Sequence, residues 1–265
     1  MTQQLHADVI VVGGGTTGAF FAWRMSQAGF LTVVLEKKKL QELGQDIDIF
    51  HMDEVRFEQF GLAPPEGEEL LGYHRTGLAW SPDRQVRNEV PYAFYVMHKP
   101  AFHRRLLRKV IEARGEIVEE VTVLEPIIEE GALTGVRAQT SGESLEARGR
   151  LVVVASGING VIRTLLAVSF GVESDRIADE DTRFVCLEFR DVLHACFPEG
   201  LNFYPYHKAF WNPSRGTGSI LGIGQPGSFD HAWQKHAQWR EEYFGEPGHV
   251  VKRAQGRTPY RRSPY

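Results

Sequence analysis

A cluster of glycines near the start of the chain has the spacing of a turn that holds phosphate groups. Gly13, Gly14 and Gly15 follow the apolar run 8–12, and Gly18 comes three residues later, inside a helix-like segment. The absence of a Cβ permits a tight turn, lets the backbone approach a pyrophosphate, and at Gly18 allows close packing of the helix on a sheet. Free N–H groups at the start of that helix favour an anion. The spacing therefore predicts a dinucleotide-binding turn.

An acidic residue stands where the second strand of such a unit would end. The apolar run 31–35 leads directly to Glu36, which is 18 residues after Gly18. A carboxylate at this position can accept hydrogen bonds from both hydroxyls of an adenosine ribose, and it would repel a 2′-phosphate. Strand, glycines, helix and acid together favour a dinucleotide over a purely structural turn, but they fit NAD and FAD equally.

The elements that follow this unit distinguish between the two cofactors. The apolar spacing predicts helices over 16–28 and 100–115, and we interpret the basic outer face of the second helix as solvated surface. Short strands then follow, over 117–123, 133–139 and 144–148, which predicts a β-meander. An NAD-binding domain would continue with further βα units, so the meander favours FAD. A buried strand over 151–155 leads into a second glycine turn at Ser156 and Gly157.

The remainder of the chain has the pattern of an antiparallel sheet. Strands are expected over 183–189, 201–206, 209–212 and 219–224, and one helix follows Ser228 as its N-cap. We interpret the basic segment 249–265 as a solvated or extended tail, with a peripheral membrane or partner contact as the less favoured alternative. The sequence thus predicts an α/β fold that becomes α+β in its second part. A Rossmann-like FAD-binding domain with a β-meander would cover 1–175, with insertions near 72–98, and an antiparallel substrate domain would cover 176–265.

Composition limits the remaining classes of function. The chain has 265 residues, 42% of them hydrophobic, and a formal net charge of −4, which argues against a nucleic-acid binder. No apolar run approaches the roughly 20 residues that cross a membrane, and no basic leader precedes the first strand. Cys186 and Cys196 have no metal-ligand spacing, so we expect two reduced thiols, a cytoplasmic protein and no metal site.

The order of these parts resembles the FAD-dependent oxidoreductases of the geranylgeranyl reductase and FixC-like group, which share a fold with para-hydroxybenzoate hydroxylase. The resemblance covers nearly the whole chain and is carried by segments 11–18, 95–102, 152–163 and 210–224, together with Glu36. It implies an oxidoreductase that transfers hydride through flavin N5 to or from an apolar or isoprenoid-like substrate. The electron donor would be NAD(P)H or a reduced carrier protein.

The same resemblance implies which residues form the sites. The cofactor would contact Gly13, Gly15, Thr16, Thr17, Gly18, Glu36, Lys37, Lys99, Val121, Val123, Ser156 and Gly157. Four aromatic residues are candidates for the wall of the substrate site, namely Tyr204, Tyr206, Phe210 and Trp211. No side chain is assigned a catalytic role, because the flavin ring carries the chemistry in this group.

Departures from the group keep two alternatives open. His103 replaces the usual aspartate after Phe102, Ser156 replaces an aspartate common in hydroxylases, and the segment 44–48 replaces a cysteine-glycine motif of the reductases. One alternative is an FAD-dependent aromatic monooxygenase on the same fold. The other is a non-catalytic dinucleotide-binding remnant or an electron-transfer flavoprotein fragment.

The end of the chain is the largest departure. Members of the group continue past a segment like 257–265 into a strand and a glycine-aspartate motif that completes the flavin site, whereas this sequence stops at Tyr265. The resemblance therefore implies a C-terminal truncation, an incomplete substrate domain and weak affinity for FAD.

Overall fold

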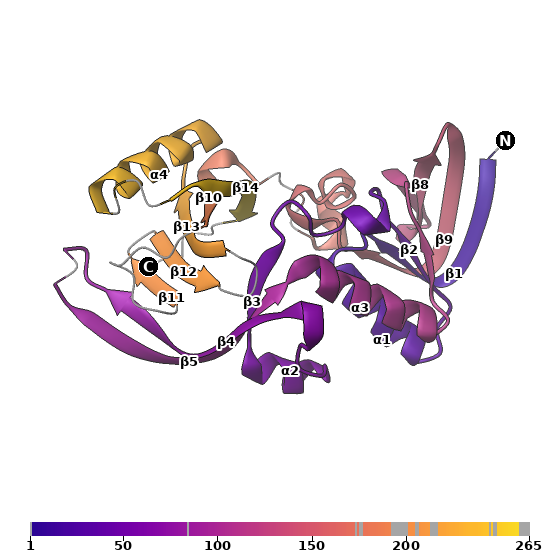
Figure 1. Cartoon of the computed structure of the whole chain (residues 1–265). Coiled ribbons are helices and arrows are strands. Elements are labelled where there is room, and N and C mark those ends of the chain that lie inside the picture. Colours follow the sequence, from indigo (N-terminus) through magenta and orange to yellow (C-terminus); the bar gives the residue numbers. More distant parts are fainter. Residues whose placement is uncertain are drawn as a thin grey trace. The chain divides into compact units, whose positions relative to one another are not determined.

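The computed structural model consists of two compact units, each built from two stretches of the chain (Figure 1). The first unit comprises Met1–Gln45 and Pro100–Arg176, and the second comprises Asp46–Lys99 and Ile177–Tyr265. Residues 46–99 separate the two stretches of the first unit, so this insertion is longer than the one near 72–98 that the sequence indicates. The structure describes residues 2–83, 85–172, 174, 177–191, 201–204, 207–212, 217–243, 245 and 248–259.

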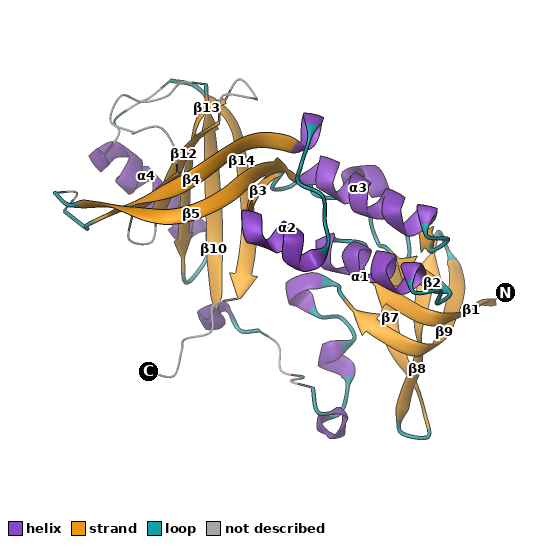
Figure 2. Ribbon diagram, turned by 90° about the horizontal axis from the view of Figure 1, so that it is seen from below, coloured by secondary structure: helices purple, strands orange, loops and turns teal. Residues whose placement is uncertain are grey.

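A six-stranded sheet forms the centre of the first unit. Its strand order is β6-β2-β1-β9-β8-β7, and the first four of these strands are parallel. The strands are β1 (Thr2–Val12), β2 (Thr32–Leu35), β6 (Glu116–Val118), β7 (Thr122–Glu129), β8 (Ala132–Thr140) and β9 (Glu143–Val154). Two helices complete the unit, α1 (Thr16–Gln27) and α3 (Lys99–Glu112), and they lie side by side in Figure 2. The predicted α/β class is confirmed, and the structure contains a β-meander, β7-β8-β9. The strand predicted over 117–123 is wrong, because residues 116–118 form β6, which pairs parallel with β2, and the meander begins with β7 at residue 122.

One long strand replaces two predicted strands. The sequence indicates separate strands over 144–148 and 151–155, but β9 runs without interruption alongside β1, from Ser144 opposite Thr2 to Val154 opposite Val12. Gly149 lies against the side chain of Ile10, because a Cβ at Gly149 would be 3.0 Å from it. Residues 148–150 are polar or glycine, but they remain in the strand because β1 pairs with the residues that precede them and with those that follow them.

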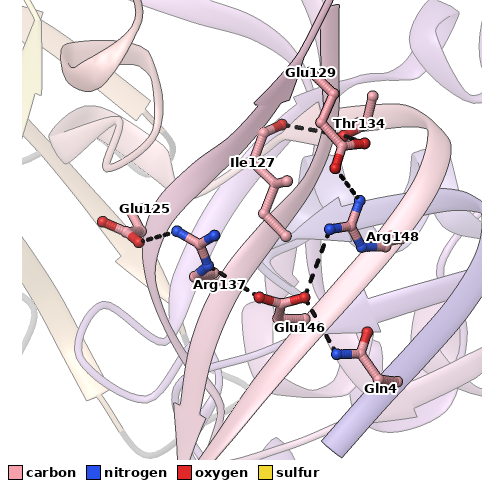
Figure 3. Close-up of polar contacts among 8 residues, drawn as sticks. All are labelled: Gln4, Glu125, Ile127, Glu129, Thr134, Arg137, Glu146 and Arg148. Carbon is pink, nitrogen blue, oxygen red and sulfur yellow. Dashed lines mark hydrogen bonds and ion pairs between the residues drawn. The ribbon is translucent and has the colours of Figure 1, made fainter. Parts of the chain in front are cut away.

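The exposed face of the meander carries a network of charged side chains (Figure 3). Arg137 on β8 bonds Glu125 at 2.7 Å and Glu146 at 3.0 Å. Arg148 on β9 bonds Glu129 at 2.9 Å and approaches Glu146 at 3.6 Å. These side chains face solvent on neighbouring strands, so the network stabilises the pairing of β7, β8 and β9 only modestly.

The second unit is built on an eight-stranded sheet of order β14-β10-β13-β12-β11-β4-β5-β3. Its strands are β3 (Ile49–Asp53), β4 (Leu70–Trp80), β5 (Arg87–His98), β10 (Thr182–Arg190), β11 (Leu201–Tyr204), β12 (His207–Asn212), β13 (Thr217–Gln225) and β14 (Val250–Pro259). The helices α2 (Glu54–Phe60) and α4 (Phe229–Tyr243) belong to this unit. Short 3-10 turns in the two units cover Leu40–Glu42, Gly67–Glu69, Gly157–Asn159, Arg163–Leu165, Val168–Phe170 and Asp179–Asp181.

Strand β14 shows that residues 250–259 of the basic segment are extended, one of the two predicted forms, but that they belong to the sheet of the second unit. It pairs antiparallel with β10, from Pro259 opposite Thr182 to Val250 opposite Arg190. Three of its cations meet carboxylates of the same unit: Lys252 meets Asp48 at 3.1 Å, Arg253 meets Glu188 at 3.1 Å, and Arg257 meets Asp179 at 3.1 Å. The three cations of β14 are therefore paired with carboxylates that are distant in the sequence.

Helix α4 covers one face of the second sheet. Ser228 caps it as predicted, because its Oγ accepts a hydrogen bond from the His231 N–H at 3.2 Å. Phe184 and Cys186 of β10 pack beneath this helix, and burial raises the pKa of the Cys186 thiol to about 11. This thiol therefore stays protonated at neutral pH. The reduced state that the sequence predicts for both thiols stays a prediction, and Cys196 lies outside the described residues.

Candidate functional site

The two glycine turns lie next to each other at the carboxyl edge of the first sheet. Strands β1 and β9 are parallel neighbours, and the Ala155 N–H donates to the Val12 carbonyl at 2.8 Å. Gly13 has a φ of 104°, and a Cβ there would lie 2.6 Å from the Ala155 carbonyl oxygen. A side chain at Gly13 is thus excluded twice, by the backbone conformation and by the neighbouring turn.

Gly18 and Gly15 serve different purposes in the first turn. A Cβ at Gly18 would lie 1.9 Å from the Gly13 carbonyl oxygen, so this glycine allows α1 to pack against the turn. A Cβ at Gly15 would meet nothing within 4 Å, and its φ of −63° is open to any residue. The fold itself does not require Gly15, which leaves a free approach to the backbone at the start of α1. Such an approach is what a pyrophosphate needs.

Glu36 is fixed at the end of β2 by two backbone donors. Its Oε2 accepts from the Gly14 N–H at 2.6 Å, and its Oε1 accepts from the Lys38 N–H at 2.8 Å. The residue is only 7% exposed, so its carboxylate is held in one orientation. A carboxylate offers about four acceptor positions. Two therefore remain for ribose hydroxyls, and the residues present fit an adenosine nucleotide.

The first turn of α1 is open to an anion. Its N-cap, Gly15, has no side chain and makes no capping hydrogen bond, and no acidic residue lies in the first helical turn. Thr17 is exposed and Thr16 is half-buried. The Thr16 hydroxyl lies 2.6 Å from Nε2 of His103, a residue of α3 that is 4% exposed. Both the free N–H groups and the dipole of α1 can therefore stabilise a bound phosphate.

The structure brings most of the predicted cofactor residues to this edge, all of them within the first unit. Ser156 follows β9 and its Oγ accepts from the Val161 N–H at 3.3 Å, while Gly157 has a φ of 76°. Lys37 is exposed directly after Glu36. Val121 and Val123 lie near the end of β6 and in β7, where their side chains belong to the apolar core. An adenine contact at these valines stays a prediction and would have to involve the backbone.

The other predicted residues belong to the second unit. Lys99 is the first residue of α3, and its N–H donates to the Asp48 carbonyl at 2.8 Å. Its role beside the cofactor phosphates stays a prediction. The aromatic candidates Tyr204, Phe210 and Trp211 lie on β11 and β12, where the structure describes the backbone alone, and Tyr206 lies outside the described residues.

Sequence reasoning missed two contributors to this site. Gly14 supplies the N–H that holds Glu36, and His103 supplies the partner of Thr16. His103 stands out in the sequence as a replacement for aspartate, but no local pattern links it to Thr16, which lies 87 positions away.

Neither a metal-binding cluster nor a membrane-spanning helix occurs among the described residues. These residues contain no group of three or more histidine, cysteine, aspartate or glutamate side chains that could hold a metal ion. None of the helices in the described part of the chain is long and apolar enough to cross a membrane.

The chain is similar in sequence to reductases from other organisms. The digeranylgeranylglycerophospholipid reductase of Sulfolobus acidocaldarius is 25% identical over 193 residues, which are 72% of this chain and 42% of that enzyme. Digeranylgeranylglycerophospholipid reductase 2 of Methanopyrus kandleri is 27% identical over 232 residues, which are 84% of this chain and 56% of that enzyme. The chain thus spans about half the length of these relatives.

Solved structures share the fold at low sequence identity. A geranylgeranyl bacteriochlorophyll reductase-like protein from Thermoplasma acidophilum superposes with a TM-score of 0.81 at 17% identity, covering 97% of this chain and 67% of that one. A myxobacterial chondrochloren halogenase, described as FAD-dependent, superposes with a TM-score of 0.74 at 17% identity, covering 95% of this chain and 64% of that one. Residues 6–193 match the FAD binding domain family. The chain therefore belongs to the FAD binding domain family, and its cofactor is FAD.

Proposed function

We propose that the chain is an FAD-dependent oxidoreductase that transfers hydride to or from an apolar, isoprenoid-like substrate. The observation that carries this proposal is the extent of its similarity to reductases. The Methanopyrus kandleri relative aligns with 84% of this chain, and the Methanocella arvoryzae digeranylgeranylglycerophospholipid reductase aligns with 95% at 25% identity. The similarity therefore extends beyond the cofactor turn into the second unit.

The first unit would hold the cofactor. Bound FAD supplies a two-electron chemistry that side chains lack, because its ring accepts and returns a hydride at N5. The open backbone at Gly15 and the first turn of α1 would bind the pyrophosphate, and Glu36 would bind the ribose of the adenosine. Each of these groups is fixed before binding, so little conformational freedom is lost on binding.

The second unit would hold the substrate. The sheet carries an apolar cluster to which six separate strands contribute, and which would suit a hydrocarbon chain. Its buried members are Ile49, Leu71, Phe94, Val96, Leu187, Phe189, Ile220 and Ala254. We retain Tyr204, Phe210 and Trp211 as proposed residues of the substrate wall, because β11 and β12 belong to the same sheet. Tyr206, which lies outside the described residues, is retained on the resemblance alone. The electron donor would be NAD(P)H or a reduced carrier protein, and a lipid substrate would require peripheral contact with a membrane.

The proposal is tested by anaerobic turnover with a defined lipid. The chain is loaded with FAD, reduced with dithionite and mixed with a detergent-dispersed lipid that carries geranylgeranyl chains. We expect the oxidised flavin absorbance to return and the lipid to gain two hydrogen atoms per reduced double bond, with the saturated lipid as a control. Absence of both changes would contradict the proposal. A separate assay in air, with NAD(P)H and an aromatic compound, tests the monooxygenase alternative, which hydroxylation of that compound with consumption of oxygen would support.

A further inference from the structure

A buried histidine contacts the first residue of the helix that faces the cofactor pyrophosphate. Nε2 of His103 lies 2.6 Å from Oγ1 of Thr16, a distance within the range of hydrogen bonds that involve a hydroxyl. His103 is 4% exposed. Water therefore competes little for this bond, and its loss would be felt at Thr16.

The helix that carries His103 runs parallel to α1 and is held along it. His103 meets Thr16 near the start of both helices, and the Lys109 ammonium lies 4.6 Å from the centre of the Trp23 ring further along. Beyond the end of α3, a Cβ at Gly115 would lie 2.4 Å from the Ser26 hydroxyl. These contacts fix the imidazole relative to the first turn of α1.

The hydrogen-bonding capacity of the two groups decides what Thr16 can offer to an anion. A hydroxyl has one proton to donate, and a neutral imidazole nitrogen either donates or accepts. If Nε2 accepts, the hydroxyl proton points at His103 and only lone pairs remain, which repel a phosphate oxygen. If Nε2 carries the proton, it donates to Thr16 and the hydroxyl proton is available for a phosphate oxygen.

We propose that His103 is a positioning residue for the FAD pyrophosphate: it donates from Nε2 to the Thr16 hydroxyl, which in turn donates to a phosphate oxygen. Bound FAD then favours the tautomer of His103 that carries its proton on Nε2. In metal sites, too, the partner of one imidazole nitrogen determines which nitrogen carries the proton. This inference depends on the FAD cofactor and not on the proposed reduction of a lipid. Its test needs no substrate, so failure of either proposal can be recognised separately.

A double-mutant cycle on FAD affinity is the test. The dissociation constant is measured for the unaltered chain, Thr16→Val, His103→Leu and the double variant, and the midpoint of thermal unfolding is measured without FAD. Each single replacement should weaken FAD binding by about ten-fold or more, the scale for a hydrogen bond to a charged group. The double variant should bind FAD about as weakly as Thr16→Val alone, because His103 acts only through that hydroxyl.

Conservative variants distinguish positioning from packing. Thr16→Ser keeps the hydroxyl, and His103→Gln can place an amide N–H near the position of Nε2, so both should retain most of the affinity. His103→Glu offers only acceptors when ionised and should bind FAD as weakly as His103→Leu. Equal losses for His103→Gln and His103→Leu, or independent effects in the double variant, would overturn the proposal.

Two further measurements separate the pyrophosphate from the rest of the cofactor. ADP contains the pyrophosphate and should lose affinity with Thr16→Val, whereas adenosine should bind both chains equally. The ¹⁵N chemical shifts of His103 in the FAD-bound chain should show the proton on Nε2. Weaker binding of adenosine in parallel with ADP, or a bare Nε2 in the complex, would refute the assigned role.

Discussion

At the scale of single residues, the glycines of the turn at 13–18 differ in whether the fold leaves room for a side chain. Gly13 and Gly18 are needed by the fold, since an added Cβ would lie within 2.6 Å and 1.9 Å of backbone oxygens. Gly15 is not needed by the fold, because the space beside it is open. We therefore predict that a ligand, and not packing, requires the missing side chain at Gly15.

Replacement of Gly15 by valine should separate binding from folding. Gly15→Val places a branched side chain in the open space, so we expect FAD binding to be lost and the unfolding midpoint without FAD to change little. Gly18→Ala is the matched contrast, because its Cβ collides with the Gly13 carbonyl and should destabilise the chain itself. Calorimetric titration and thermal unfolding measure the two effects. FAD binding by Gly15→Val with unchanged affinity would place the pyrophosphate elsewhere.

Glu36 should matter through its free acceptor positions. Glu36→Ala removes the proposed ribose contacts and also leaves the Gly14 and Lys38 N–H groups without their carboxylate. We expect the free energy of FAD binding to weaken by about 1 to 3 kcal/mol. Glu36→Gln keeps one acceptor oxygen and should show a smaller loss. If both variants bind FAD like the parent chain in a fluorescence titration, Glu36 does not contact the cofactor.

At the scale of elements, strand β10 is held between β14 and α4 by one buried carboxylate. Glu188 is 1% exposed and accepts from Arg190 at 2.6 Å and 2.8 Å and from Arg253 at 3.1 Å and 3.2 Å. Burial alone would raise the pKa of this carboxyl, but the Arg190 hydrogen bonds and the nearby positive charges hold it below its usual value. Glu188 is therefore charged and paired in the folded chain.

Loss of this carboxylate should destabilise the second unit strongly. Glu188→Gln leaves the nearly buried guanidinium of Arg190 without its counter-charge, so we expect unfolding to become easier by about 3 to 5 kcal/mol. Glu125→Gln is the control, since it breaks one exposed ion pair of the meander and should cost about 0 to 1 kcal/mol. Urea denaturation measures both values. Similar values for the two variants would show that the Glu188 cluster does not stabilise β10.

The meander network should contribute stability that depends on pH. Arg148 lowers the pKa of the Glu129 carboxyl and Arg137 lowers that of Glu146, both from 4.5, mainly by hydrogen bonds. A carboxyl with a lowered pKa in the folded chain adds stability above its unfolded pKa, and this stability is lost as pH falls through the folded pKa.

Arg148→Gln should therefore lower the urea midpoint at neutral pH, and the difference from the parent chain should shrink as pH falls below 4.5. High salt should also shrink this difference, because both partners face solvent. Arg75→Gln, on the exposed surface of β4, is a control outside the network. A difference that stays constant from neutral to acidic pH would exclude a contribution from these ion pairs.

At the scale of the whole molecule, the sequence predicts features whose cause is local. The glycine turn, Glu36, the Ser228 cap and the meander follow from the spacing of neighbouring residues, and the structure confirms the elements that they predict. Strand β14 and the joined strand β9 could not be predicted in this way, because their partners β10 and β1 lie far away in the sequence. The contact between Thr16 and His103 depends on the packing of two helices for the same reason.

The central claim is that the first unit binds FAD through the turn at Gly13–Gly18 and Glu36. Parallel calorimetric titrations of the purified chain with FAD, NAD and NADP test this claim most directly, with Gly15→Val as the control. We predict one FAD per chain, no heat of binding with NAD or NADP, and loss of the FAD signal in Gly15→Val. Binding of NAD or NADP without binding of FAD, or full FAD binding by Gly15→Val, would contradict it.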